Sequence, residues 1–382
     1  MPELKETPTW FCSELIKMDT SNPPGGEKRA AEFCFQLLKG WGYETQLIDH
    51  GGDRASLVAI MEGLQGADVI LIVGHLDTVP AGDLTAWKTD PFSGKIDQKY
   101  IYGRGASDMK GGLSVMLHTA RLLRGKKIKN TIIFAFTADE ESGCRGANAL
   151  LDLDLIQNAK LILIPEPTSN QIGIAEKGAL WLRLVTYGKS AHGSMPELGI
   201  NAIEKMIKMI NNLEISSFEK EHHPYLGSFT HSLNTIKGGI KTNVIPDCCN
   251  ATLDIRTLPS QDHFQIMESY SNSLNRMADK DPLIAYKLET IINKPGIEID
   301  PTNPLIAQVL DLIQCKDRES RLIGLNYFTD GAVLVPRLKI PFLIYGPGDA
   351  NQAHKNNERI LISKLLHSCR IYEHLIRALV IE

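Results

Sequence analysis

The sequence lacks the features of exported, membrane-spanning and nucleic-acid-binding proteins. No run of apolar residues approaches the roughly 20 that a membrane helix needs, and Met1-Pro-Glu-Leu-Lys5 is not a basic start followed by an apolar core. The formal charge is only −4, so no excess of basic residues favours nucleic acid or an anionic membrane. We therefore expect a cytoplasmic protein that binds neither nucleic acid nor membranes.

Cysteine is scarce and scattered along the chain. Seven cysteines in 382 residues, an odd number, do not indicate a disulfide framework. Internal repeats, low-complexity tracts and long runs of one charge are also absent. A chain of this length exceeds what one hydrophobic core usually supports, which indicates two domains.

What the sequence does contain is a set of short apolar runs that are followed by histidine or acidic residues. Uninterrupted runs of this kind are typical of strands buried on both faces, as in the parallel part of an α/β sheet. The runs, each with its polar residues, are 69–73 with His75 and Asp77, 131–137 with Glu140 and Glu141, 161–164 with Glu166, and 340–345 with His354. Because ligands bind beyond the carboxyl ends of parallel strands, these side chains should meet in one cleft.

The pair His75 and Asp77 has two interpretations. Side chains alternate along a strand, so the two residues share a face and the carboxylate can hydrogen-bond one imidazole nitrogen. The pair is then either a buried histidine satisfied by a neighbour or a metal ligand with its orienting group.

The other acidic residues also have ordinary structural explanations. Asp108 precedes a helix predicted over 113–123 and could be its N-cap. Glu140 and Glu141 could answer the dipole of a helix predicted over 142–151. That explanation suits one carboxylate better than the three consecutive ones found here.

The order of helices and strands indicates one domain inserted into another. Alternating helix and strand patterns predict a mixed α/β sheet with helices on both faces. Within 179–293 the order becomes strand, helix, strand, strand, helix, strand, as in a ferredoxin-like α+β unit. We therefore expect a catalytic domain over 1–178 and 294–382, interrupted by an inserted domain over 179–293. His222 and His223 are expected at a helix end, outside any metal site.

Imidazole and carboxylate ligands without thiolates favour zinc, cobalt or manganese. The candidate ligands are His75, Asp108, Glu141, Glu166 and His354. Five ligands with one bridging carboxylate match two ions roughly 3.5–4 Å apart better than one ion. Such a pair activates water, and a nearby carboxylate that binds no metal can move the proton to a leaving nitrogen. Amide hydrolysis is therefore the expected reaction.

Six motifs, in order along the chain, carry a resemblance to a known family. They are Gly74-His-Leu-Asp-Thr-Val-Pro80, Gly103-Arg-Gly-Ala-Ser-Asp-Met-Lys-Gly-Gly112, Thr137-Ala-Asp-Glu-Glu-Ser-Gly143, Pro165-Glu-Pro-Thr168, Ser190-Ala-His-Gly193, and Gly346-Pro-Gly348 with Ala353-His354. In these motifs the chain resembles the two-zinc metallohydrolases that include acetylornithine deacetylase, succinyl-diaminopimelate desuccinylase, aminoacylases and carboxypeptidase G. The resemblance implies a zinc-peptidase-like catalytic domain.

The resemblance also implies which residue holds which ion. One zinc ion would be bound by His75 and Glu166. The other would be bound by Glu141 and His354, and Asp108 would bridge the two.

For the remaining residues the resemblance implies catalytic and substrate-binding roles. Asp77 would orient its histidine, and Glu140 would be the general base. The inserted domain would form a homodimer in which His192 reaches the partner's active site and stabilises the oxyanion; from its spacing alone, His192 is a surface-loop residue. Asn243 and Arg256 match substrate-binding positions, and a planar guanidinium suits a substrate carboxylate.

The substrate is less defined than the reaction. Desuccinylases carry an Arg-Arg-Gly run where this chain has Ala175-Glu-Lys-Gly-Ala179, which disfavours succinyl-diaminopimelate. The expected substrate is an N-acyl amino acid or a short peptide. The alternatives are dipeptidase or carboxypeptidase activity, or an amino-acid or peptide binding protein that has lost catalysis. Glu140 argues against loss of catalysis, because binding alone needs no base outside the ligand set.

Overall fold

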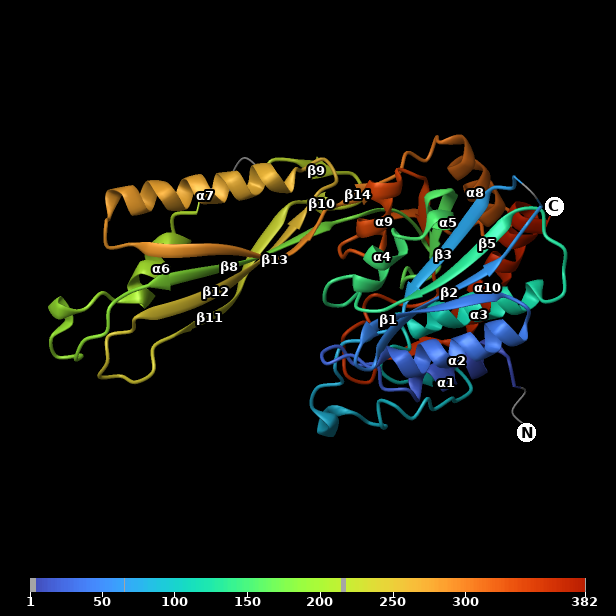
Figure 1. The fold of residues 1–382 in the computed structure, drawn as a ribbon, viewed down its shortest axis with the longest axis horizontal. Helices are drawn as coiled ribbons and strands as arrows, with labels where there is room; N and C mark the ends of the chain where they lie inside the picture. The colour runs from blue at the N-terminus through green and yellow to red at the C-terminus, as the bar shows by residue number, and fades with distance from the viewer. Residues whose placement is uncertain (1–4, 65, 214–217, 382) are drawn as a thin grey trace. The chain divides into compact units, whose positions relative to one another are not determined.

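The computed structural model describes residues 5–64, 66–213 and 218–381, and the chain divides into two compact units (Figure 1). Unit 1 comprises Met1–Ile174, Ile299–Ile323 and Thr329–Glu382, and unit 2 comprises Ala175–Glu298 and Gly324–Phe328. Within the described ranges, no helix combines the length and apolar character needed to cross a membrane.

A mixed sheet lies at the centre of unit 1, as the sequence predicts. Its strands follow the order β1-β2-β5-β3-β6-β16-β7. The middle four, β5, β3, β6 and β16, run parallel, whereas β1, β2 and β7 pair antiparallel with their neighbours. The bounds are β1 Glu44–Gly51, β2 Arg54–Met61, β3 Val69–His75, β5 Thr131–Thr137, β6 Ala159–Ile164, β7 Ile172–Glu176 and β16 Phe342–Ile344. Every residue of β3 and β5 is buried, which explains their uninterrupted apolar sequence.

Helices cover both faces of this sheet. Figure 1 shows α1, α2 and α3 on one side and α4 and α5 on the other. The helices are α1 Pro8–Ile16, α2 Glu27–Gly40, α3 Lys110–Leu123, α4 Arg145–Leu150, α5 Asp154–Gln157, α8 Pro304–Gln314, α9 Gly331–Leu338 and α10 Ile362–Ile376, with the short 3-10 helix η1 Leu84–Ala86 and the π-helical segment η3 Arg377–Ile381. One buried core joins them to the sheet and includes Phe11, Leu38, Phe134 and Tyr372. A separate antiparallel pair, β4 Tyr100–Tyr102 and β17 Arg359–Leu361, lies outside the sheet.

Unit 2 has the predicted order of strands and helices. Its four-stranded sheet follows the order β11-β12-β8-β13 with every pair antiparallel, as in a ferredoxin-like fold. The elements are β8 Gly178–Tyr187, α6 Ala202–Ile210, β11 Thr230–Gly238, β12 Cys248–Thr257, α7 His263–Lys280 and β13 Ala285–Lys294. Apolar residues of α6 and α7, among them Met206 and Leu274, pack on the sheet.

Four short strands and one turn complete the chain: β9 His222–His223, β10 Gly227–Ser228, β14 Ile297–Glu298, β15 Leu322–Leu325 and η2 Pro196–Leu198. The prediction that His222 and His223 lie at a helix end is wrong. They form β9 and pair with β10 across a turn at 224–226, after which Gly227 adopts a φ of 69° that favours glycine. His223 contacts Glu298 at 3.0 Å.

Candidate metal centre

The carboxyl ends of the four parallel strands bring most of the candidate ligands together. His75 is the last residue of β3 and lies opposite Thr137, the last residue of β5. Glu141 follows β5, Glu166 follows β6, and His354 lies in the loop after β16. The fifth candidate, Asp108, comes from the loop that precedes α3.

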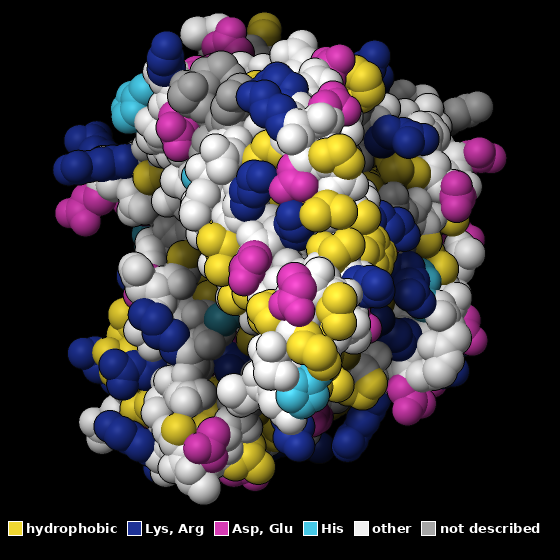
Figure 2. Space-filling model, turned by 90° about the vertical axis from the view of Figure 1, so that its left-hand side faces the viewer, with side chains coloured by type: hydrophobic (Ala, Val, Ile, Leu, Met, Phe, Trp, Pro, Cys, Tyr) yellow, Lys and Arg dark blue, Asp and Glu magenta, His cyan; other side chains and the backbone are white. Residues whose placement is uncertain are grey.

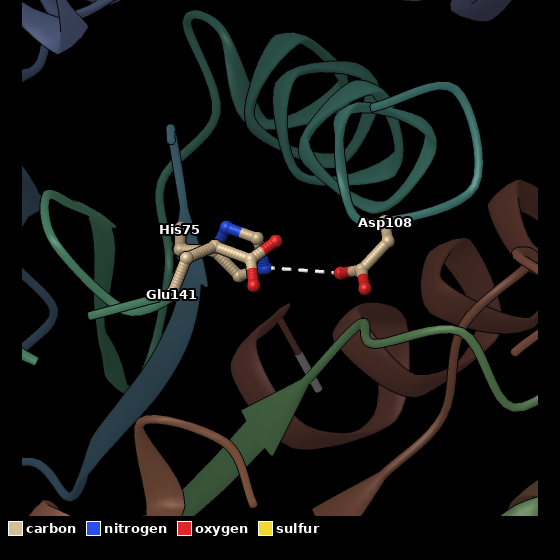
Figure 3. A group of neighbouring side chains, drawn as sticks. All are labelled: His75, Asp108 and Glu141. Carbon is tan, nitrogen blue, oxygen red and sulfur yellow. Dashed lines mark hydrogen bonds and ion pairs between the residues drawn. The ribbon is translucent and has the colours of Figure 1, made fainter. Parts of the chain in front are cut away.

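Asp108 lies between the two histidines. Its Oδ1 is 3.1 Å from Nε2 of His75 (Figure 3), and its Oδ2 is 3.5 Å from Nε2 of His354. Glu166 Oε1 lies 3.6 Å from His75 Nε2, and Glu141 Oε2 lies 3.1 Å from His354 Nε2. The structure therefore brings all five predicted ligands together, with one acidic residue beside each histidine and the fifth between them.

The electrostatics of this cluster fit bound cations. His75 and Glu166 are at most 3% exposed, and burial raises the pKa of Glu166 well above its ordinary value. Burial also opposes ionisation of Asp108, but hydrogen bonds from His354 and His75 outweigh it and lower the pKa of Asp108. Buried carboxylates this close together are costly unless positive charge accompanies them. Nitrogen and oxygen donors without sulfur suit a hard or borderline divalent ion.

Asp77 contacts His75 differently from the prediction. His75 Nδ1 donates to the main-chain carbonyl of Asp77 at 2.8 Å, whereas the Asp77 carboxylate is 3.7 Å away. This bond leaves Nε2 facing Asp108. The carboxylate is turned away because it accepts instead from the backbone N–H groups of Glu140 and Glu141, at 3.1 and 3.2 Å. Asp77 is fully buried, and burial raises its pKa to about 7.

The structure rejects the helix-dipole explanation of Glu140 and Glu141. The helix predicted over 142–151 begins only at Arg145, so both glutamates precede it. The backbone at Cys144 is left-handed, with φ at 54°, and Asp77 already binds the two N–H groups. Gly143 N also donates to the Asp139 carbonyl at 2.8 Å, so a turn that ends at the left-handed Cys144 separates both glutamates from the helix.

The N-cap explanation of Asp108 is also wrong. The N-cap of α3 is Met109, and no side-chain hydrogen bond caps that helix. The Asp108 carboxylate faces His75 and His354 instead.

Glu140 has the surroundings of a proton acceptor. It is 6% exposed, and burial raises the pKa of Glu140 well above its ordinary value, while the charge of His75 lowers it. The charges of Glu166 and Glu141 raise it further. Bound cations would oppose these effects, since positive charge favours the carboxylate.

A buried polar network behind the Glu140 turn was not predicted from the sequence. Asn22 Nδ2 donates to Asp77 Oδ2 at 2.9 Å and to Asp139 Oδ1 at 3.1 Å. Arg54 contacts Asp139 at 2.8 Å and Glu27 at 2.6 Å. The sequence signal was limited to a cluster of polar and proline residues around Asn22, which predicts a loop but not its contacts.

In unit 2, the structure brings His192 and Asn243 together. Gly193 N donates to the Asn243 carbonyl at 2.9 Å, and His192 pairs with Val244 in an isolated bridge. Ser194 N donates to Nδ1 of His192 at 3.2 Å, so the proton of a neutral imidazole resides on Nε2. His192 and Asn243 are both exposed.

Arg256 lies away from these two residues. β12 begins at Cys248, shortly after Asn243, and Arg256 lies near its other end, about 26 Å along an extended strand. Nε and one terminal nitrogen of Arg256 already donate to both carboxylate oxygens of Asp254, at 2.8 and 3.1 Å. Two of its donors are therefore paired within unit 2. The substrate-binding role that the resemblance implies for Arg256 stays a prediction.

A mixed sheet with imidazole and carboxylate groups at the ends of its parallel strands defines a metallopeptidase-like fold. The fold resembles that of the M20 family metallo-carboxypeptidase Sso-CP2 from Sulfolobus solfataricus, with a TM-score of 0.83, 19% identity and 99% of each chain covered. The family model for peptidase family M20/M25/M40 matches residues 71–378, and the chain belongs to this family. It is therefore a hydrolase of amide bonds, as predicted.

Two curated relatives support the same assignment. A probable succinyl-diaminopimelate desuccinylase of Staphylococcus epidermidis is 28% identical over 401 residues, which cover 96% of each chain. An acetylornithine deacetylase of Shigella sonnei is 32% identical over 333 residues, which cover 84% of each chain.

Proposed function

We propose that this protein is a two-metal amidohydrolase that cleaves an N-acyl amino acid or a short peptide. The observation that carries the proposal is the position of Asp108, whose two oxygens face His75 and His354 separately. His75 and Glu166 would hold one ion, Glu141 and His354 the other, with Asp108 shared between them. Zinc is the expected metal, with cobalt or manganese as alternatives.

In this proposal the residues around the ions prepare and move one proton. Two divalent cations, when bound, would polarise the scissile carbonyl and lower the pKa of water. Glu140 accepts the proton of that water and returns it to the leaving nitrogen. Asp77 holds the Glu140 turn through two backbone hydrogen bonds, so the base is placed before substrate binds. The carbonyl of Asp77 keeps His75 in the tautomer that leaves Nε2 free to bind metal.

The substrate class is proposed from the relatives. Their names describe removal of succinyl or acetyl groups from amino acids that carry a second amino group. Release of an amino acid from a dipeptide, or from the carboxyl end of a peptide, is the alternative, since the same site chemistry serves both reactions. Arg256 would contribute to binding a substrate carboxylate only through donors that Asp254 does not occupy.

We further propose a homodimer formed through unit 2. All residues of β11 are exposed, and this strand is an edge of its sheet. Leu233, Ile236 and Ile240 are 41%, 48% and 90% exposed, and Figure 2 shows hydrophobic side chains gathered among charged ones on the face turned to the viewer. Arg256 lies about 26 Å along β12 from Cys248, whereas His192 pairs with Val244, close to the Cys248 end of that strand. We infer that one small substrate would not contact both residues of the same unit 2. A dimer would let His192 serve the partner's site.

The proposal is tested by metal content and substrate profile together. The full chain, loaded with Zn²⁺ or Co²⁺, would be assayed against acetyl, succinyl and formyl amino acids and against dipeptides. We expect two ions per chain and turnover of at least one of these amides, abolished by chelation and restored by metal. A protein that binds two ions but only binds the amides without cleaving them would contradict the proposed activity. Cytoplasmic location stays a prediction.

A further inference from the structure

A buried carboxylate outside the proposed ligand set joins the two segments that carry Asp108 and His354. Glu358 follows His354 by four residues and directly precedes β17. It is 1% exposed, and its side chain contacts the loop 103–108, which ends at Asp108.

Both oxygens of Glu358 accept hydrogen bonds from that loop. Oε2 accepts from Gly105 N at 2.9 Å and from the guanidinium of Arg104 at 2.8 Å. Oε1 accepts from Ser107 N at 2.8 Å and from Asp108 N at 3.1 Å. Arg104 is itself only 2% exposed. Hydrogen bonds to a charged acceptor are stronger than neutral ones, and burial strengthens them further.

Two further contacts make the loop and the His354 segment one connected piece. Ser107 Oγ donates to the Asp349 carbonyl at 2.9 Å and accepts from Asp349 N at 2.6 Å. β4 and β17 pair directly beside the Glu358 contacts, with Tyr102 opposite Arg359. Glu358 therefore lies between two backbone segments that each deliver one proposed metal ligand.

We propose that Glu358 is a positioning residue that holds Asp108 within reach of His354. It would thereby support the ion that Glu141, His354 and Asp108 would bind. The inference rests on the proposed two-metal function. Its physical basis is that one of the four hydrogen bonds ends on the backbone N–H of Asp108 itself. Without that bond the carboxylate of Asp108 is free to turn away from one histidine, whereas His75 and Glu166 are held by β3 and β6.

The variant Glu358→Gln tests this with little change in size. The amide oxygen of glutamine still accepts, but its NH₂ group must face two of the donors that the carboxylate binds, so two of the four contacts become repulsive. We expect a 10- to 100-fold weaker affinity for one of the two ions, the range typical when a group that supports a ligand is removed. Affinity for the other ion, which Asp108 would also bind, should fall by less.

The measurement is a Co²⁺ titration of the metal-free full chain, followed by visible absorption, with the unfolding temperature of the metal-free protein recorded for each variant. Ser107→Ala removes only the hydrogen bonds between the Ser107 hydroxyl and Asp349. It should lower the Co²⁺ affinity for the same ion by a smaller factor, and it keeps the test informative if Glu358→Gln does not fold. Asp281→Asn is the matched control, because Asp281 accepts from Lys205 and Lys208 in unit 2 and should leave both Co²⁺ affinities unchanged.

Each outcome decides between positioning and a purely structural role. Selective weakening of one ion, with a similar unfolding temperature without metal, supports the proposal. Unchanged binding of both ions in Glu358→Gln and Ser107→Ala would overturn it. Equal loss of both ions together with a lower unfolding temperature would also overturn it, since Glu358 would then support only the fold. Fewer than two ions bound by the unaltered protein would instead count against the proposed function.

Discussion

The two units of this chain hold their polar site residues in opposite ways. In unit 1, Asp77, Glu140 and Glu166 are 0%, 6% and 3% exposed, and the backbone or carboxylate of each belongs to a buried cluster. In unit 2, His192 and Asn243 are exposed, and His192 is held mainly by Ser194, two residues away. The first arrangement buries most of its groups, with the side chain of His354 an exception at 54% exposed, whereas the second exposes its donors to solvent.

In the proposed mechanism, unit 1 would bind the metals and transfer the proton, and unit 2 would donate a hydrogen bond to the substrate. A group that must move a proton or hold a cation needs burial and fixed neighbours, because desolvation and charge set its pKa. A group that only donates a hydrogen bond to the oxyanion can reach the substrate after it has bound. Such a group needs only the tautomer that places a proton on the donating nitrogen. The bond from Ser194 supplies that tautomer to His192.

The largest expected effect is the loss of turnover when Glu140 is replaced. It tests whether Glu140 is the base and its neighbours in unit 1 are the metal ligands. Glu140→Gln removes the proton acceptor but no proposed ligand, so turnover should fall about 10²- to 10⁴-fold while two ions remain bound. Glu141→Gln is the matched comparison, because it removes a ligand and should reduce metal content. Metal analysis and kcat on the same samples decide. Loss of metal from Glu140→Gln would mean that base and ligand are assigned the wrong way round.

The buried network behind the base should matter more for stability than any exposed pair in unit 2. Arg54→Met leaves Glu27, which is fully buried, without its cation and weakens the support of Asp139. We expect a loss of about 3 kcal/mol in the free energy of unfolding, as for other broken buried ion pairs.

Denaturant unfolding followed by circular dichroism measures this loss. Arg183→Met, which removes an exposed pair with Glu289 in unit 2, is the control and should leave the midpoint unchanged. Equal effects of the two substitutions would remove the distinction between the units.

The sequence predicts that His75, Glu141 and Glu166 meet at the strand ends, because their signal is local. Each of these residues ends or closely follows a buried apolar strand. Their role as metal ligands stays a prediction. The network behind them has no such signal, because Asn22 lies 117 residues from Asp139, and Glu358 lies 253 residues from Gly105. Such contacts have no periodicity, so only the folded chain reveals them.

Two other differences between sequence and structure have local causes. The pattern favours a helix from 142, but a turn closed by the Asp139 carbonyl and the left-handed backbone at Cys144 delay its start to Arg145. The pairing of Arg256 with Asp254 is also local. Short alternation along a strand places both side chains on one face, which would have predicted that pair.

Replacing His192 tests whether an exposed residue of unit 2 contributes to turnover. His192→Ala removes an exposed side chain, so the unfolding temperature and oligomeric state should not change. Turnover should fall about 10²- to 10³-fold if this imidazole donates to the oxyanion, with metal content unaffected. His222→Ala, at an exposed histidine of unit 2 outside β11, provides the control. Full activity of His192→Ala would confine the active site to unit 1.

The direct test of action between chains uses mixed dimers. Inactive Glu140→Gln chains combined with inactive His192→Ala chains would place both intact groups at one site of each mixed dimer. Activity should then recover to a fraction of the wild-type value, because His192 of one chain would complete the site of the other. Activity that stays at the level of the separate variants would exclude the trans arrangement.

The smallest expected effect concerns His263, a buried histidine inside unit 2. His263 is 7% exposed; Thr257 Oγ1 lies 2.7 Å from its Nε2, and Asn293 Oδ1 lies 2.6 Å from its Nδ1. Burial lowers the pKa of His263 below its ordinary value, although the bond to Asn293 opposes this. The unfolded chain therefore binds the proton more readily, and the stability of unit 2 should fall as the pH drops below the ordinary histidine range. The slope cannot exceed about 1.4 kcal/mol per pH unit for one proton.

Hydrogen exchange of β12 amides in the metal-free protein, measured at neutral and at mildly acidic pH, should show faster opening at the lower pH, and His263→Gln should flatten that dependence. If His263→Gln opens with the same pH dependence as the wild-type protein, groups other than His263 control the stability of unit 2 in acid.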